Sequence, residues 1–297
     1  MPSTPHRFAA NTASSSSSSS SSSLPLSSSD EQGIRLIVER ALRRGVDLRQ
    51  YKENFVKRRL DIRLKARNVA GYLQYAQLLE KDAAEFGALL ATFSINVTEF
   101  FRDVDFYNAF YSSIIPELYR RAGQQKGEVR VWSAGCASGE EPYTIAIMFS
   151  EAAESLAGFR GRVVATDLSE KAIGAAAQGV YGATQLANLP DSLLSKYFTR
   201  LADGRYRVSD RLKSMVDFGT GNLSTMSPPQ QQLDAVFCRN VLIYFDKDMQ
   251  YSILSKFHRS LRGGGYFVLG QSEAVMGESS TLFEAVMPKE RIYRKKG

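Results

Sequence analysis

The pattern of apolar and polar positions divides the chain into two regions. Between Asp30 and Phe93 apolar residues recur every three or four positions, as Val56, Leu60 and Leu64 do, which predicts amphipathic helices. From Val129 onward short β-rich runs alternate with helical stretches, which predicts a mainly parallel sheet covered by helices on both faces. We therefore expect a small helical subdomain followed by an α/β domain. The predicted helices of the first region span about 30–45, 51–67, 70–80 and 83–93.

The domain limits follow from changes in composition. An unbroken serine run, Ser14 to Ser23, has almost no apolar surface to offset its ordering entropy, so residues 1–29 are predicted to be a disordered tail. The helical subdomain then covers 30–95 and the α/β domain covers 96–297. Within the α/β domain the alternation of strands and helices is interrupted at about 180–217, which indicates a small insertion at the ligand edge of the sheet.

Charge and composition narrow the class of protein. The formal charge of +7 predicts a basic face and an acidic partner, either nucleic acid, a membrane surface or an acidic protein. Two cysteines, Cys136 and Cys238, and two histidines exclude a disulfide framework and argue against a Cys/His metal site. The sequence contains neither an 18-residue apolar run nor a signal-peptide core, so we expect a cytoplasmic protein that holds no metal and does not insert into a membrane.

The stretch from Val129 to Tyr143 is the candidate ligand site. A β-rich run leads into a small-residue turn, Ser133–Gly139, and then into a helix predicted from Pro142, an arrangement that presents nucleotide-like ligands at the end of a strand. A dinucleotide site would show Gly-x-Gly-x-x-Gly, and that fingerprint is missing. Two carboxylates, Glu140 and Glu141, follow instead. They would repel a diphosphate and favour a cationic ligand, although the helix dipole explains one of them by itself.

An acid at the end of the next strand extends this interpretation. Asp167 follows the predicted strand that begins at Gly161, where it can accept hydrogen bonds from ribose hydroxyls. The alternative is that it caps the helix starting near Glu170, but Ser169 can supply that cap. S-adenosylmethionine suits both features, because it joins an adenosine to a cationic sulfonium and ammonium.

Several separated motifs occur in a fixed order along the chain: Asn96-x-Thr98-x-Phe-Phe-Arg102, the run from Trp132 to Tyr143, Asp167, Asn222-Leu223, and the run from Phe237 to Asp246. Together they resemble those of the chemotaxis receptor methyltransferase (CheR) family, over about residues 31 to 295. The resemblance implies an S-adenosylmethionine-dependent protein-glutamate O-methyltransferase that modifies chemoreceptors. It also implies a Rossmann-like methyltransferase sheet with an N-terminal all-helical subdomain and a small β-subdomain insertion.

The resemblance also assigns the site residues. Glu141 would face the charged methionine end, Asp167 the ribose and Asn222-Leu223 the adenine. Cys238 is interpreted as a small buried residue with only its backbone near the ligand. The complete implied cofactor set is Asn96, Thr98, Arg102, Glu141, Asp167, Asn222, Leu223, Cys238 and Arg239.

The reaction needs little acid–base help, because a glutamate with a pKa of about 4.3 is already ionised at neutral pH. Catalysis should then come from positioning the reactants and excluding water. We assign Arg102 to hold the incoming carboxylate by charge-assisted hydrogen bonds and Tyr244 to orient it through its hydroxyl.

A basic stripe on the second predicted helix is the candidate partner surface. Between Tyr51 and Ala70 there are seven Lys and Arg residues and two acids, and Arg59, Arg63 and Arg67 repeat at four-residue spacing. Such a run is often only a solvated helix face. The resemblance implies a helical, acidic methylation region of a chemoreceptor as partner, so we expect docking here, by a monomer. Some family members bind a receptor tether through the β-subdomain; the turn Leu201–Gly204 is short here, which leaves tether binding open.

Two other functions remain open on the sequence. An S-adenosylmethionine-dependent RNA methyltransferase would explain the positive charge, but there is no basic platform studded with aromatic residues on which bases could stack. A non-enzymatic regulator that only binds the cofactor is disfavoured by the presence of Arg102 and Tyr244. We therefore expect no nucleic-acid partner.

Overall fold

The computed structural model describes residues 28–95, 97–124 and 127–297. The predicted disordered tail lies outside the described residues, except for Ser28 and Ser29, which begin the first helix. The described residues form two compact units. The helical unit comprises residues 28–95 together with Tyr244–Gln250, and the sheet unit comprises the described residues of 97–243 and Tyr251–Gly297.

The helical unit confirms the four predicted helices, with ends shifted by a few residues. A 3-10 turn, η1 (Leu48–Gln50), precedes the second helix, which begins at Glu53 because Lys52 has a non-helical ψ of 134°. Tyr244–Gln250 joins this unit through backbone contacts, since Lys52 N donates to Tyr244 O at 3.0 Å. The helices are α1 (Ser28–Arg43), α2 (Glu53–Ala66), α3 (Tyr72–Lys81) and α4 (Ala83–Ala91).

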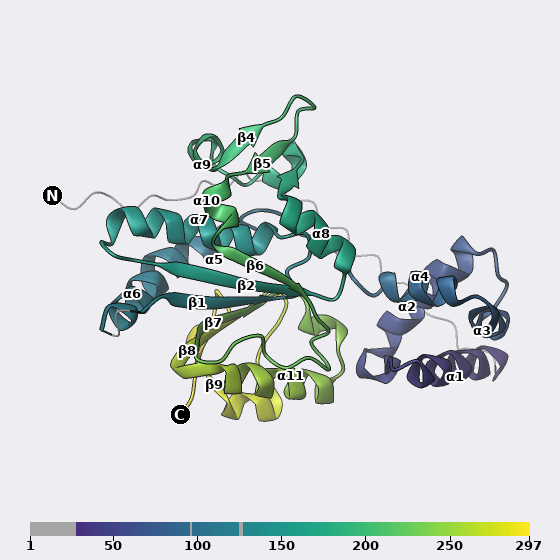
Figure 1. The fold of residues 1–297 in the computed structure, drawn as a ribbon. Coiled ribbons are helices and arrows are strands. Elements are labelled where there is room, and N and C mark those ends of the chain that lie inside the picture. Colours follow the sequence, from purple (N-terminus) through teal and green to yellow (C-terminus); the bar gives the residue numbers. More distant parts are fainter. Residues whose placement is uncertain (1–27, 96, 125–126) are drawn as a thin grey trace. The chain divides into compact units, whose positions relative to one another are not determined.

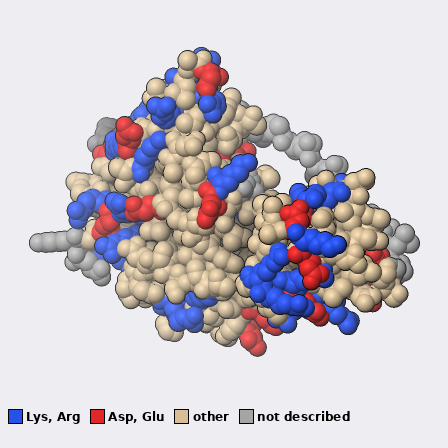
Figure 2. Space-filling view, turned by 45° about the vertical axis from the view of Figure 1, so that its right-hand side comes forward, with Lys and Arg blue, Asp and Glu red and all other residues tan. Residues whose placement is uncertain are grey.

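A buried carboxylate ties α2 to α4. Glu85 is 1% exposed and accepts two hydrogen bonds from Arg63, at 2.8 and 2.7 Å, one from Arg67 and one from the Tyr75 hydroxyl, both at 2.7 Å. Burial raises the pKa of Glu85, but these hydrogen bonds outweigh it and lower the pKa to about 2. Two of the three arginines in the predicted stripe therefore stabilise the fold. On the side that Figure 2 shows, Lys and Arg side chains of this unit lie beside one another, with acidic side chains among them.

The sheet unit is built on seven strands in the order β6-β2-β1-β7-β8-β10-β9. The first five of that order are parallel, and β10 and β9 pair antiparallel at the edge. The predicted turn Arg262–Gly265 is wrong, because these residues lie inside β8, where a register shift opposite Leu233 accommodates them. β9 was not predicted. The strands are β1 (Val129–Ala134), β2 (Gly161–Asp167), β6 (Val216–Thr220), β7 (Leu233–Cys238), β8 (Leu261–Leu269), β9 (Phe283–Met287) and β10 (Ile292–Lys295).

Helices cover both faces of the sheet, as predicted (Figure 1). On one face Phe110 packs on Phe237 with ring centroids 5.0 Å apart, and on the other Trp132 packs on Phe257 at 5.1 Å. Phe110 lies in a π-helical turn, η2 (Phe110–Ile114), within the predicted long helix. The first face carries α5 (Val104–Ala109), α6 (Ile115–Gln124) and α7 (Glu140–Ser155), α8 (Glu170–Gln178) follows β2, and the second face carries α11 (Lys247–Ser260).

The predicted insertion is a three-stranded antiparallel sheet in the order β3-β5-β4. It ends at about Met215, because Val216 already belongs to β6 of the main sheet. Gly204, with φ +84°, makes the tight turn between β4 and β5. Its elements are β3 (Val180–Tyr181), η3 (Ala183–Leu186), α9 (Asp191–Tyr197), β4 (Phe198–Arg200), β5 (Tyr206–Val208) and α10 (Asp210–Lys213); the further 3-10 turns are η4 (Leu242–Tyr244) and η5 (Gly277–Thr281).

Among the described residues, no helix combines the length and the apolar character that a membrane span requires.

The Glu85 network makes stability depend on pH. Because the folded pKa is depressed from 4.5 to about 2, its contribution is present above pH 4.5 and is lost as the pH falls toward 2. Glu85→Gln should therefore lower the free energy of unfolding by about 3 kcal/mol at pH 7. Urea titrations followed by circular dichroism at pH 7 and pH 3 would measure this. An equal deficit at both pH values would contradict the assignment.

Candidate functional site

The loops after the central strands meet where the strand order reverses. β2 and β7 lie on opposite sides of β1, and ligands of open α/β sheets bind outside the carboxyl ends of the strands at such a point. The turn after β1 contains three left-handed residues, Gly135 (φ +84°), Ala137 (φ +47°) and Gly139 (φ +95°). A Cβ at Gly135 would lie 2.5 Å from Val241 Cγ2, so glycine is required there for the turn to pack on the loop after β7.

The two adjacent glutamates have different environments. Glu140 is fully buried, and its carboxylate accepts from Ser138 Oγ at 2.9 and 2.8 Å and from Gln185 Nε2 at 2.5 Å. Glu141 accepts from Ser133 Oγ at 2.7 Å and lies 3.8 Å from an Arg239 nitrogen. Glu140 is therefore committed to holding the turn and the insertion together. For Glu141 the nearest cation among the described residues is Arg239, at 3.8 Å, which is beyond hydrogen-bond distance. The Glu141 side chain also retains 14% exposure.

Burial raises the pKa of Glu141, which Arg239 and Ser133 oppose. Burial also raises the pKa of Glu140, against hydrogen bonds from Ser138 and Gln185. The site thus contains a carboxylate that is desolvated and only partly compensated by the protein. A cation bound beside Glu141 would complete the compensation.

Arg239 connects the strand β7 to the segment before α5. Its guanidinium lies 2.5 Å from Asp103 Oδ2 and donates to the Tyr107 hydroxyl and to Arg102 O, each at 3.2 Å. It also stacks over Phe106 at 4.5 Å. Burial lowers the pKa of Arg239, but Tyr107, Glu141 and Asp103 outweigh it and leave the pKa raised, so the side chain stays charged. Within the described part of the chain, Arg239 Nε is buried without a hydrogen-bond partner.

Asp167 fixes the glycine turn. Its Oδ2 accepts from Ala137 N and its Oδ1 from Ser169 N, both at 2.9 Å. Ser169 caps α8 through a bond from Ala172 N, which confirms that Asp167 is not needed as the cap. Burial raises the pKa of Asp167 against these backbone hydrogen bonds. Its ribose role stays a prediction.

The loop after β6 carries Asn222 and Leu223. Asn222 Oδ1 accepts from Ser224 N and Oγ at 2.9 Å, and Leu223 is 8% exposed. Lys256 donates to Leu223 O at 2.8 Å and to Ser224 O at 2.7 Å, so an ammonium on α11 holds this loop. Neither side chain has a tested role toward adenine.

The structure gives the surroundings of the remaining predicted site residues in different detail. Cys238 is fully buried, as its interpretation as a small core residue required. Arg102 is partly exposed and donates to Val97 O at 3.1 Å, and Thr98 is partly exposed. Asn96 lies outside the described residues. Tyr244 belongs to the helical unit, where its ring lies 4.7 Å from that of Phe55, so its catalytic role stays a prediction.

Several participants were missed from the sequence. Asp103 and Tyr107 hold Arg239, and Lys256 holds the Asn222 loop. Glu273 accepts four backbone hydrogen bonds beside the site. Only Glu273 had a usable signal, because it is an acid shortly after a predicted strand, as Asp167 is.

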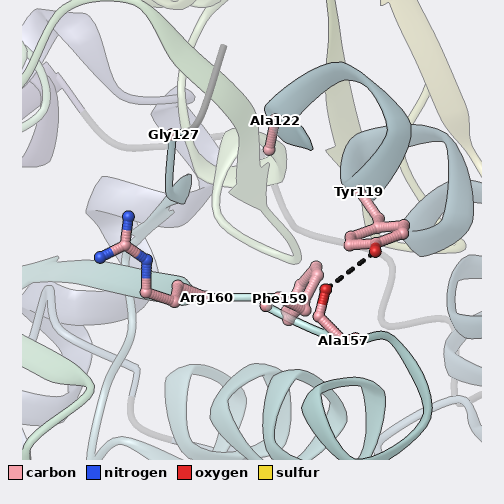
Figure 3. Close-up of a pocket in the computed structure, with 7 residues that line it drawn as sticks. Tyr119, Ala122, Gly127, Ala157, Phe159 and Arg160 are labelled. Carbon is pink, nitrogen blue, oxygen red and sulfur yellow. Dashed lines mark hydrogen bonds between the residues drawn. The ribbon is translucent and has the colours of Figure 1, made fainter. Parts of the chain in front are cut away.

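One pocket lies away from these loops, near the amino ends of β1 and β2 (Figure 3). Tyr119 donates to Ala157 O at 2.9 Å across it, and Arg160 lies at its other end. The described residues that line it include no carboxylate, so it does not suit a cationic ligand. Across the described residues no group of three His, Cys, Asp or Glu side chains could hold a metal ion.

The fold and site together define the class of the protein. A strand order that reverses at β1, a turn after β1 with three left-handed residues and a desolvated glutamate fit S-adenosylmethionine, whose cationic end suits Glu141. The family description "CheR methyltransferase, SAM binding domain" matches residues 96–292, and "CheR methyltransferase, all-alpha domain" matches 38–94. The chain is an S-adenosylmethionine-dependent methyltransferase. More particularly, it belongs to the CheR methyltransferase family.

Relatives span most of the chain. A chemotaxis protein methyltransferase of Borreliella burgdorferi is 34% identical over 249 residues, which cover 82% of this chain and 87% of that protein. The protein of the same name from Escherichia coli is 35% identical over 248 residues, which cover 80% and 82%. That from Salmonella typhimurium is 35% identical over 245 residues, which cover 80% and 81%.

The contrast between the two glutamates gives a matched test. Glu141→Gln should weaken S-adenosylmethionine binding by about tenfold or more, because it removes the carboxylate charge from a desolvated site. Glu140→Gln, one residue away, should change affinity by less than about threefold, because the Glu140 side chain is already saturated by Ser138 and Gln185. Isothermal titration calorimetry would measure both.

Calorimetry of the parent protein should also show binding weakening as the pH falls through the raised pKa of Glu141, since protonation removes its charge. Equal losses in the two variants would show that Glu141 has no special role.

Proposed function

We propose that this methyltransferase transfers the methyl group of S-adenosylmethionine to glutamate side chains of chemoreceptors and forms glutamyl methyl esters. The observation that supports this is the joint presence of the cofactor domain and the all-alpha domain in a chain whose relatives are chemotaxis protein methyltransferases. The substrate is then the cytoplasmic, helical methylation region of a chemoreceptor. We further propose that the protein acts as a monomer and that nucleic acid is not its substrate.

Bound S-adenosylmethionine supplies an electrophilic methyl group on a positively charged sulfur. The substrate carboxylate, with a pKa of about 4.3, is ionised at neutral pH and needs no general base. The task of the protein is therefore to hold two reactants in line and to exclude water. Glu141 holds the cationic end of the cofactor, and Arg239, itself balanced by Asp103, keeps the carboxylates of the site from repelling one another.

Two residues are proposed to act on the incoming glutamate. Arg102 is partly exposed, and its charge, like that of Arg239, opposes the rise that burial causes in the pKa of Glu141, so it lies near the acidic part of the site. It can therefore bind the substrate carboxylate by charge-assisted hydrogen bonds. Tyr244 is assigned to orient that carboxylate through its hydroxyl, on the strength of the family motif that ends at Asp246.

Methyl transfer from labelled S-adenosylmethionine to receptor fragments tests the function. The expected product is a protein label that is released by mild base, as a glutamyl ester would be. Label in RNA would favour an RNA methyltransferase, and cofactor binding without any transfer would favour a regulator.

In the same assay Arg102→Ala and Tyr244→Phe should each lower turnover by about tenfold to a hundredfold, because each removes one positioning contact in the transition state. S-adenosylhomocysteine affinity, measured separately by calorimetry, should fall less than turnover does. Undiminished turnover in both variants would remove these assignments.

The docking surface is proposed to lie on α2 around Arg59, Arg63 and Arg67. Arg59 stacks over Phe55 at 4.9 Å, and no ion pair is found for it among the described residues. Arg63 and Arg67 share Glu85, so part of their charge is already neutralised. More available cations lie beside this stripe. Arg58 and Lys65 are both exposed, and the exposed Ile62 lies between them at helical spacing.

A charge-reversal pair separates docking from stability. Arg58→Glu with Lys65→Glu should raise the KM for an acidic receptor fragment by about tenfold and leave S-adenosylhomocysteine affinity unchanged, because only long-range attraction is lost. Added salt should weaken the parent in the same way. Arg63→Glu with Arg67→Glu should in addition lower the unfolding midpoint, since Glu85 is left buried.

The control reverses two exposed cations elsewhere in the helical unit, Arg35 and Lys81. It makes the same change in net charge. A KM increase as large in this control would mean that net charge, and not the α2 surface, attracts the receptor.

A further inference from the structure

The loop after β7 contains a residue in a costly backbone conformation. Asn240 has φ +61°, in the left-handed region that residues other than glycine seldom adopt. Its backbone N–H donates to Glu273 Oε2 at 2.6 Å. A residue in this conformation persists where its surroundings hold it, and Glu273 is one group that does so here.

Glu273 is committed entirely to backbone groups of two loops. Oε2 also accepts from Gly270 N at 2.8 Å, while Oε1 accepts from Val241 N at 3.0 Å and Ile243 N at 3.3 Å. The residue is 6% exposed. Burial raises the pKa of Glu273, and the backbone N–H groups oppose that change. One carboxylate therefore organises the loop after β7 and joins it to the loop after β8.

The two loops also fit closely in shape. A Cβ at Gly270 would lie 2.7 Å from Asn240 Nδ2 and 2.9 Å from Asn240 N. Glycine is thus needed at position 270 for Asn240 to reach Glu273. Hydrogen bonding and packing select the same conformation.

The arrangement repeats one on the other side of the site. Ala137, with φ +47°, donates its N–H to Asp167 Oδ2 at 2.9 Å. In both cases a buried carboxylate accepts from a left-handed residue in the loop after β1 or β7; Asp167 is the last residue of the neighbouring strand β2, and Glu273 lies in the loop after the neighbouring strand β8. Asp167 is a predicted cofactor residue, whereas Glu273 lies outside every predicted set.

The loop that Glu273 holds builds two parts of the cofactor site. It begins at Arg239, which lies 3.8 Å from Glu141, and its Val241 occupies the space that Gly135 leaves open. A change in this loop would move both the cation beside Glu141 and the packing of the glycine turn. We propose that Glu273 is a positioning residue for the cofactor site, acting through Asn240 and its loop. This inference rests on S-adenosylmethionine as the cofactor and not on the receptor as the substrate.

Glu273→Gln is the direct test. An amide nitrogen cannot accept a hydrogen bond, so whichever way the amide is turned it faces either Asn240 N and Gly270 N or Val241 N and Ile243 N without an acceptor. S-adenosylhomocysteine affinity, measured by calorimetry without any substrate, should therefore fall by about tenfold or more. Glu273→Asp, which keeps the charge but withdraws it, should give an intermediate loss and supplies a second measurement should the first variant fold poorly. The control is Glu278→Gln. Glu278 is an exposed acid that follows the loop after β8, and this variant should bind S-adenosylhomocysteine as the parent does.

A second substitution distinguishes loop positioning from general destabilisation. Asn240→Gly removes the strain of the left-handed conformation, so in the Glu273→Gln protein it should recover at least about threefold of the lost affinity. Amide hydrogen exchange at residues 240, 241 and 243 should be faster in Glu273→Gln than in the parent, while exchange in the helical unit stays unchanged.

Parent-like affinity in both Glu273 variants would overturn the proposal. A loss of affinity that Asn240→Gly fails to recover would also overturn it. So would a loss of affinity that is not accompanied by faster amide hydrogen exchange at residues 240, 241 and 243. Failure of the parent to methylate receptors would contradict the proposed function but would leave all of these measurements intact.

Discussion

The cofactor site depends on buried carboxylates that accept backbone N–H groups. Asp167 accepts from Ala137 N, and Glu273 accepts from Asn240 N. Ala137 and Asn240 are both in a left-handed backbone conformation that costs energy by itself. These contacts hold the loops after β1 and β7 in paths that the close packing at Gly135 and Gly270 also favours. Burial raises the pKa of each carboxyl group, and the backbone N–H donors offset part of that desolvation. Hydrogen bonds between buried side-chain carboxylates and backbone N–H groups therefore help to set the shape of the site.

The same physics explains why adjacent glutamates differ. Glu140 and Glu141 open one helix, but successive helical positions point in different directions. Glu140 accepts hydrogen bonds from Ser138 and Gln185 and has a structural role, whereas Glu141 accepts from Ser133 and lies 3.8 Å from Arg239, which leaves its carboxylate less fully compensated by the described residues. A methyl donor with a cationic end suits such a carboxylate, and Arg239 keeps the acidic groups of the site from destabilising one another.

The helical unit shows a comparable division among cations. Arg63 and Arg67 stabilise α2 against α4 through Glu85, while the exposed Arg58 and Lys65 are free to act at longer range. A basic stripe in a sequence thus contains both structural and available charge. In a proposed receptor-docking surface, the available cations attract the partner and the structural ones keep the helix in place.

The sequence determined the repeating elements and the kind of ligand. Helical periodicity placed α1 to α4, β-rich runs placed the parallel strands, and the turn with Glu140 and Glu141 pointed to a cationic cofactor. Periodicity is local, so it could not find β9, whose pairing with β10 depends on the finished sheet edge, or show that Arg262–Gly265 continues β8. Only the tertiary structure decided which carboxylates are paired within the fold. Glu85 pairs with Arg63 and Arg67, Glu140 accepts from Gln185, and Glu273 accepts from Asn240 N. Each partner is distant in the chain, and whether a charge is desolvated or paired depends on what the fold brings beside it.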